Sequence, residues 1–89
     1  MSEAPSDSLL EFPCDFPIKA FGEGDDFEAL IVGLVRTHAP DLDPARVRVA
    51  ASRTGRYIAV TVVVPAHSRA QLDAIYRDIS GHARVKMAL

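Results

Sequence analysis

Residues 45–66 read ARVRVAASRTGRYIAVTVVVPA, and this stretch decides the fold. It consists of two segments in which apolar residues alternate, joined by a short polar segment that contains Thr54 and Gly55. Alternation with a period of two residues is typical of a β-strand with one buried face. Glycine supplies the positive φ that a tight turn between strands requires. We therefore predict a β-hairpin over these residues.

The alternation also predicts the register of this hairpin. A two-residue turn at Thr54 and Gly55 pairs residue 47 with 62, 49 with 60 and 51 with 58, and a four-residue loop keeps the same register. Every such pair is apolar, whereas a shift of one residue would place arginines opposite the core side. Between Pro44 and Leu72 there are five arginines and no Asp or Glu. The outer side of the hairpin is therefore expected to be basic.

The flanking segments complete the order strand, helix, strand, strand, helix, strand. Residues 16–22 and 84–89 alternate as strands, and residues 25–39 and 68–80 carry apolar residues at helical spacing. Each helix joins two strands as a right-handed crossover, so both helices cover the same face of the sheet. The predicted fold class is α+β: a ferredoxin-like βαββαβ sandwich, whose four-stranded antiparallel sheet has the order 4-1-3-2.

Local signals predict how these elements begin and which side chains they bury. Asp25 with Glu28, and Ser68 with Gln71, have the spacing of capping boxes at the two helix starts. Gly33 lies inside the first helix but away from its apolar stripe. Because glycine there costs about 1 kcal/mol relative to alanine, we expect another backbone to approach it closely. In the last strand, alternation predicts three inward side chains: Val85, Met87 and Leu89.

Length and composition indicate one globular domain. The chain has 89 residues, 48% hydrophobic and 25% charged. We divide it into a flexible N-terminal tail, residues 1–14, and a domain, residues 15–89. The tail contains the apolar segment LLEFP, which we expect to pack against the domain edge; a short contact motif for a partner is the alternative.

Charge and cysteine content narrow the class of protein. The net charge of −2 gives no overall drive toward nucleic acid or membrane. One cysteine, Cys14, permits no internal disulfide, and no segment has the pattern of a signal peptide or a transmembrane helix. These features predict a cytoplasmic protein without membrane attachment.

The sequence offers little for catalysis, a metal or a cofactor. His38, His67 and His82 have no ligand spacing with one another or with Cys14, and the motifs of phosphate loops and hydrolases are absent. Acidic residues at positions 25, 26 and 28 are explained by the dipole of the helix that they begin. We therefore predict no enzyme activity, no catalytic or metal-binding residue and no cofactor.

The uncovered face of the predicted sheet is the candidate interaction site. The outward residues of the four strands form it: Lys19, Phe21, Arg46, Arg48, Tyr57, Ala59, Thr61, Val63, Arg84 and Lys86. No acid is expected among them. Three interpretations stay open: solvated arginines whose stems cover apolar surface, self-association through the face or an edge strand, and binding of anions or nucleic acid. Against nucleic acid, the third strand lacks the aromatic-rich signature of RNA-recognition modules.

In the order in which they occur, five short segments resemble the YbeD-like family of small bacterial proteins. These segments are LLEFPCDFPIKAFG, HAP, SRTGRY, QLDAIYRDI and VKMAL, and together they span residues 9–89. The resemblance implies a domain similar to the ACT regulatory domains, which usually dimerise and bind small effectors at the dimer interface. It implies no activity. Genes of the YbeD-like family are often found next to those of lipoate attachment and synthesis, so the resemblance also implies a role near lipoylation.

The function that we predict is a non-enzymatic regulatory or protein-interaction module, linked to lipoate metabolism. It would form a homodimer and contact a protein of the lipoate pathway through the sheet face and the edge strand. Two alternatives remain: a nucleic-acid-binding domain that uses the same basic face, and an ACT-like domain that binds a small effector.

Overall fold

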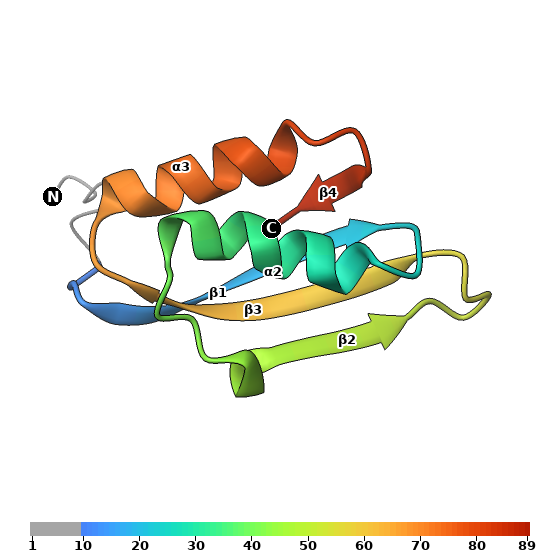
Figure 1. Ribbon diagram of the computed structural model, residues 1–89, viewed down its shortest axis with the longest axis horizontal. Coiled ribbons are helices and arrows are strands. Elements are labelled where there is room, and N and C mark those ends of the chain that lie inside the picture. The colour runs from blue at the N-terminus through green and yellow to red at the C-terminus, as the bar shows by residue number, and fades with distance from the viewer. Residues whose placement is uncertain (1–9) are drawn as a thin grey trace, which may run out of the picture.

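The computed structural model describes residues 10–89. Two helices pack on one face of a four-stranded sheet, and both lie in front of the sheet in Figure 1. We call the other face of the sheet the open face. The elements in chain order are β1 (Cys14–Gly22), α2 (Phe27–His38), a 3-10 helix (Pro44–Arg46), β2 (Val47–Ala51), β3 (Ile58–Ala66), α3 (Arg69–Ser80) and β4 (Val85–Ala88).

The sheet confirms the predicted fold class. Its strand order is β2-β3-β1-β4, and each neighbouring pair is antiparallel. Read from the other edge, this is the expected order 4-1-3-2. In the described part of the chain, no helix is long and apolar enough to cross a membrane.

The hairpin has the predicted register. Val47 pairs with Val62, Val49 with Val60, and Ala51 with Ile58. The connection is the longer of the two expected, because the Ser52 amide donates to the Tyr57 carbonyl at 2.8 Å and leaves residues 53–56 as the loop. Gly55 has a φ of 77° there, which explains the glycine.

The core lies between the sheet and the helices. The central strands β1 and β3 bury alternate side chains, and the helices bury Phe27, Ile31 and Val35 from α2 and Leu72, Ile75 and Ile79 from α3. Leu10 and Phe12 are partly buried against this core, as expected for the LLEFP segment, whose Leu9 lies outside the described residues. The proposed division into tail and domain stays a prediction, although β1 already begins at Cys14.

The two helix starts differ from each other. Ser68 caps α3 as predicted, since its Oγ accepts from the Gln71 amide at 3.1 Å; the Gln71 side chain accepts from the amide of His67 instead of Ser68. The predicted box at Asp25 is wrong. Helix α2 is preceded by Asp26, whose side chain makes no capping bond. The Asp26 carboxylate binds Arg84 instead, at 2.6 Å.

Strand β4 corrects the predicted burial of the last strand. Gly22 pairs with Val85, and its neighbour Phe21 pairs with Met87. Lys86 is therefore an extra residue of β4 at this point. An extra residue reverses the alternation beyond it. Val85 therefore faces the core as expected, whereas Met87 is 54% exposed and Leu89 is 62% exposed.

Two glycines show opposite local constraints. A Cβ on Gly22 would lie 2.5 Å from the carbonyl oxygen of Arg84 and would overlap the Phe27 ring, so close packing requires the glycine. A Cβ on Gly33 would meet nothing within 4 Å. The expected close approach of another backbone to Gly33 is therefore wrong within the described chain.

Candidate functional site

The open face is built from rows of side chains that the strand register places side by side. One row contains Arg48, Thr61 and Lys19, and it ends at Leu89, which exchanges two backbone hydrogen bonds with Lys19 at 2.8 and 3.0 Å. The next row contains Ala50, Ala59, Phe21 and Met87. Lys19, Phe21, Arg48 and Thr61 of the predicted face therefore do come together.

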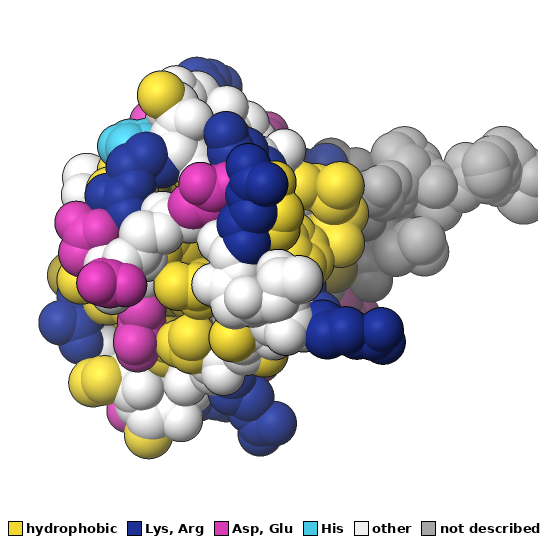
Figure 2. Space-filling model, turned by 90° about the vertical axis from the view of Figure 1, so that its right-hand side faces the viewer, with side chains coloured by type: hydrophobic (Ala, Val, Ile, Leu, Met, Phe, Trp, Pro, Cys, Tyr) yellow, Lys and Arg dark blue, Asp and Glu magenta, His cyan; other side chains and the backbone are white. Residues whose placement is uncertain are grey.

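Tyr57 and Arg56 extend this face toward the β2–β3 loop. Tyr57 is 37% exposed, and the Arg56 guanidinium lies 5.3 Å from the centre of its ring. Lys19 makes a similar contact with Phe21 at 5.8 Å. Figure 2, which views the end of the molecule that carries the β2–β3 loop, shows Lys and Arg side chains, with Asp and Glu among them, around exposed apolar ones. Cations over aromatic faces keep their charge in water while their stems cover apolar surface.

Three arginines of this region are engaged in ion pairs. Arg46 binds Asp15 at 3.0 Å, Arg56 binds Glu23 at 3.4 Å, and the Arg84 side chain binds Asp26. The expectation of an acid-free face is therefore wrong. The predicted first strand begins at Phe16, whereas β1 begins at Cys14 and therefore includes Asp15. Asp15 precedes Lys19 by four positions, so the two side chains lie on the same face of β1.

Two of the predicted site residues, Arg84 and Lys86, lie apart from these rows. Arg84 precedes β4, and its guanidinium reaches the β1–α2 loop, where it donates to the Glu23 carbonyl at 2.9 Å and to both oxygens of Asp26. The bond from Arg84 lowers the pKa of the Asp26 carboxyl, and the bond to Asp26 raises the pKa of Arg84. Lys86 is exposed beside them, and a shallow hollow of about 380 Å³ is lined by Glu23, Gly24, Ala83, Arg84 and Lys86.

The open face also contains a smaller apolar hollow. Ala50 and Ala59 face each other across β2 and β3, and their short side chains leave a depression between Phe21 and Tyr57. We call this the alanine hollow; it has a volume of about 200 Å³, and its lining consists of Phe21, Ala50, Ala51, Ser52, Tyr57 and Ala59. Met87 and Leu89 add exposed apolar surface on the β4 side, and sequence reasoning missed them because no local signal marks the extra residue in β4.

The histidines and Cys14 do not form a common site. His38 Nε2 lies 2.6 Å from Asp78 and His67 Nε2 lies 3.2 Å from Asp41, while His82 accepts a bond from the Arg84 amide. Cys14 is partly buried against the core. Within residues 10–89, no group of three or more His, Cys, Asp or Glu side chains is arranged to hold a metal ion.

Comparison with known proteins identifies the family. Residues 7–89 match the family described as protein of unknown function DUF493. This chain belongs to the DUF493 family. The YbeD-like resemblance refers to the same family. The UPF0250 protein of Chromobacterium violaceum is 51% identical over 82 residues, covering 91% of this chain and 92% of the relative. That of Nitrosomonas europaea is 42% identical over 84 residues, covering 93% and 97%.

A solved structure supports the fold of this DUF493 member. The solution structure of protein HP0495 from H. pylori superimposes with a TM-score of 0.71 and covers 100% of this chain and 98% of that one. The two sequences are only 17% identical, so the likeness concerns the fold alone.

Proposed function

We propose that this DUF493 protein is a small, non-enzymatic regulatory module that pairs with a second copy through β2 and offers its open face to another protein. The observation that carries the proposal is the outer edge of β2. This strand pairs with β3 on one side only, and four of its five residues are exposed.

The two edges of the sheet are not equally suited to pairing. β4 has four residues, an irregular pairing near its start and an exposed lysine in it. Short, charged or irregular edges are the usual means by which proteins prevent strand addition. β2 pairs with β3 without irregularity, and its sequence VRVAA contains two β-branched residues and a single charge. The β2 edge is therefore the better template.

Charge selects one register for a symmetric β2–β2 pair. Antiparallel strands related by a twofold axis place one residue opposite its own copy, and like charges directly opposite are destabilising. An axis at Arg48 would oppose two guanidinium groups. An axis at Val49 opposes two valines and places each Arg48 opposite Ala50. Val49 is 48% exposed in the single chain, so this register also covers apolar surface.

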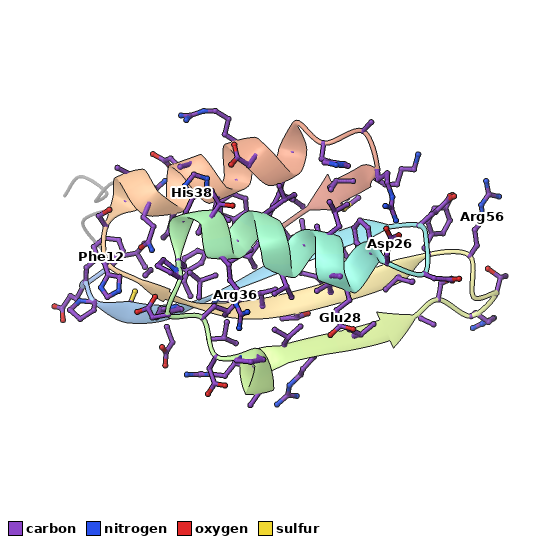
Figure 3. The ribbon with its side chains drawn as sticks, in the orientation of Figure 1. Phe12, Asp26, Glu28, Arg36, His38 and Arg56 are labelled. Carbon is purple, nitrogen blue, oxygen red and sulfur yellow. The ribbon has the colours of Figure 1, made fainter. Side chains whose placement is uncertain are left out.

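Helix α2 adds complementary charge next to the same edge. Glu28 and Arg36 both point from α2 toward β2 in Figure 3, from opposite ends of the helix. They line a groove of about 360 Å³ between α2 and β2. A twofold axis at Val49 runs the two α2 helices antiparallel, so that the Glu28 end of one copy lies beside the Arg36 end of the other.

A charge exchange at Val49 tests this pairing. We expect a dimer for the wild type in multi-angle light scattering at micromolar concentrations, and monomers for Val49→Lys and Val49→Asp, because each places two like charges opposite each other. An equimolar mixture of the two variants should recover a heterodimer, since Lys then faces Asp. Thr54→Lys adds the same charge in the β2–β3 loop and should leave the dimer intact.

Two results would contradict the pairing. A monomeric wild type at 100-fold higher concentration would refute self-association. A wild-type dimer that both Val49 variants retain would place the interface elsewhere. Circular dichroism of each variant checks that loss of the dimer does not result from unfolding.

For the protein partner, we propose an enzyme of lipoate attachment or synthesis, on the strength of the YbeD-like resemblance. Tagged wild type and Arg48→Glu would be mixed with a purified lipoate ligase. Retention by the wild type and loss with the variant is the expected result. Equal retention by both proteins would exclude the open face, and retention by neither would exclude this enzyme.

A further inference from the structure

The alanine hollow of the open face is an apolar depression with small and aromatic side chains in its lining. Ala50 and Ala59 line it between two aromatic residues, Phe21 on β1 and Tyr57 immediately before β3. Apart from Tyr57, Ser52 is the one residue of this lining with a hydroxyl group. The Ser52 Oγ accepts a hydrogen bond from the Tyr57 amide at 3.0 Å. The hollow is open to solvent on one side. Its volume of about 200 Å³ exceeds the volume of about 150 Å³ of an enclosed apolar cavity that binds benzene, so an aromatic ring fits by size alone.

Positive charge lies on both sides of the hollow along the strand direction. On one side is the row of Lys19 and Arg48, neither of which forms an ion pair in the described part of the chain. Adjacent rows on one sheet face are separated by about 7 Å, twice the rise per residue. On the other side is Arg56, stacked on Tyr57 and held to Glu23 only by an exposed pair at 3.4 Å. Such exposed pairs contribute little and exchange readily.

We propose that the alanine hollow receives one aromatic or large aliphatic side chain of an acidic, extended segment in a partner protein, with a carboxylate on each side of that anchor. In an extended chain, a residue two positions from the anchor lies about 7 Å from it, which equals the separation of adjacent rows on the sheet face. Acids at these two positions therefore lie opposite the cations on either side of the hollow. A buried apolar anchor supplies affinity, and the charged rim supplies specificity and orientation. This inference rests on the proposed use of the open face for a protein partner and specifies the chemistry of that partner.

Charge argues against the two other occupants of this face. A second copy packed face to face would bring Lys19 and Arg48 against the same cations of its partner. Pairing through β2 with the axis at Val49 instead places the partner's Arg48 beside Ala50, at the edge of the hollow, and does not cover its opening. A nucleic-acid strand would bring continuous phosphates past Asp15 and Glu23 on a chain of net charge −2. A segment with two carboxylates and one apolar anchor matches the local charge without this repulsion.

The test uses a capped synthetic peptide, Ser-Glu-Ser-Phe-Ser-Glu-Ser, titrated into the ¹⁵N-labelled full chain. We expect NMR shifts at the amides of Phe21, Ala50, Ser52, Tyr57 and Ala59. A peptide with Ser in place of Phe should bind at least tenfold more weakly. A peptide with Gln in place of both Glu should bind severalfold more weakly and lose the salt dependence.

Variants of the protein distinguish binding in the hollow from nonspecific binding of the peptide elsewhere on the surface. Ala59→Leu fills the hollow and should weaken the Phe peptide at least tenfold, and Tyr57→Ser, which removes one wall, should do the same. Ala70→Leu makes an equal change at an exposed alanine of α3 and should leave binding unchanged. The ¹⁵N spectrum of each variant shows whether it is folded.

Three results would overturn the inference. The first is no shift at the hollow with any of the peptides. The second is equal binding of the Phe and Ser peptides. The third is binding of a ten-nucleotide oligouridylate to the same amides, with steep salt dependence, in the absence of peptide binding. The retention experiment with Arg48→Glu tests the use of the open face, and the Val49 variants test self-association. A failure of the peptide to bind the hollow is therefore distinguishable from a failure of either part of the proposed function.

Discussion

Replacement of Gly33 by alanine is expected to stabilise this protein, whereas the same replacement at Gly22 is expected to destabilise it. Gly33 is exposed in the interior of α2, and an added Cβ meets no atom within 4 Å. Alanine is favoured over glycine in a helix interior by about 1 kcal/mol. For a domain of this size, that free energy raises the melting temperature by about 4–8 °C.

Gly22 provides the matched control because the chemical change is identical. Here the added methyl would lie 2.5 Å from the Arg84 carbonyl and against the buried Phe27 ring, so β1 must separate from β4 or the ring must move. Overpacking of this kind costs about 1–3 kcal/mol. The predicted difference between the two variants is therefore about 2–4 kcal/mol, opposite in sign around the wild type.

Thermal and urea unfolding, followed by circular dichroism at 222 nm, measures both changes. Each variant is unfolded at two protein concentrations so that self-association is separated from the stability of the single chain. A Gly33→Ala variant that is no more stable than the wild type at both concentrations would refute the helix-propensity argument. A neutral Gly22→Ala would refute the inferred close packing of β1 on Phe27.

Three further outcomes follow from local contacts. Asp26→Asn should lower stability near pH 7, and this deficit should shrink as the pH falls below 3.8. Arg84 lowers the folded-state pKa of Asp26 beneath its ordinary value of 3.8, so the stabilisation is fully present above that value and is lost as the pH falls through the folded-state pKa. Urea unfolding from pH 2 to 7 measures it, and an equal deficit at every pH would contradict it. Ser68→Ala should lower the free energy of unfolding by about 1 kcal/mol in the same assay, since Ser68 caps α3 by accepting from the Gln71 amide. An unchanged urea midpoint would show that this cap does not stabilise the protein. Met87→Ser should change the free energy of unfolding by less than about 0.5 kcal/mol, as for an ordinary surface position. A loss of several kcal/mol would show that Met87 is buried in the core.

The candidate site was partly predictable. Lys19, Phe21, Arg48 and Thr61 were placed together because strict alternation allows no other face once the hairpin valines are buried. The alanine hollow depends on two small residues meeting across strands and on where Tyr57 ends the loop. The ion pairs of Arg46 and Arg84 join residues 31 and 58 positions apart in the sequence, so no local pattern indicates them.

The sequence by itself determined the hairpin register, the strand order and the cap of α3. Each of these follows from a periodicity or from a spacing of a few residues, and a single violation would place charge in the core. Only the tertiary structure decided which side of the sheet the C-terminal residues occupy. One extra residue in β4 reverses the alternation and turns Met87 and Leu89 onto the open face, at the point where Gly22 packs against Phe27 and the Arg84 carbonyl. That contact between distant segments leaves no periodic signal in the chain.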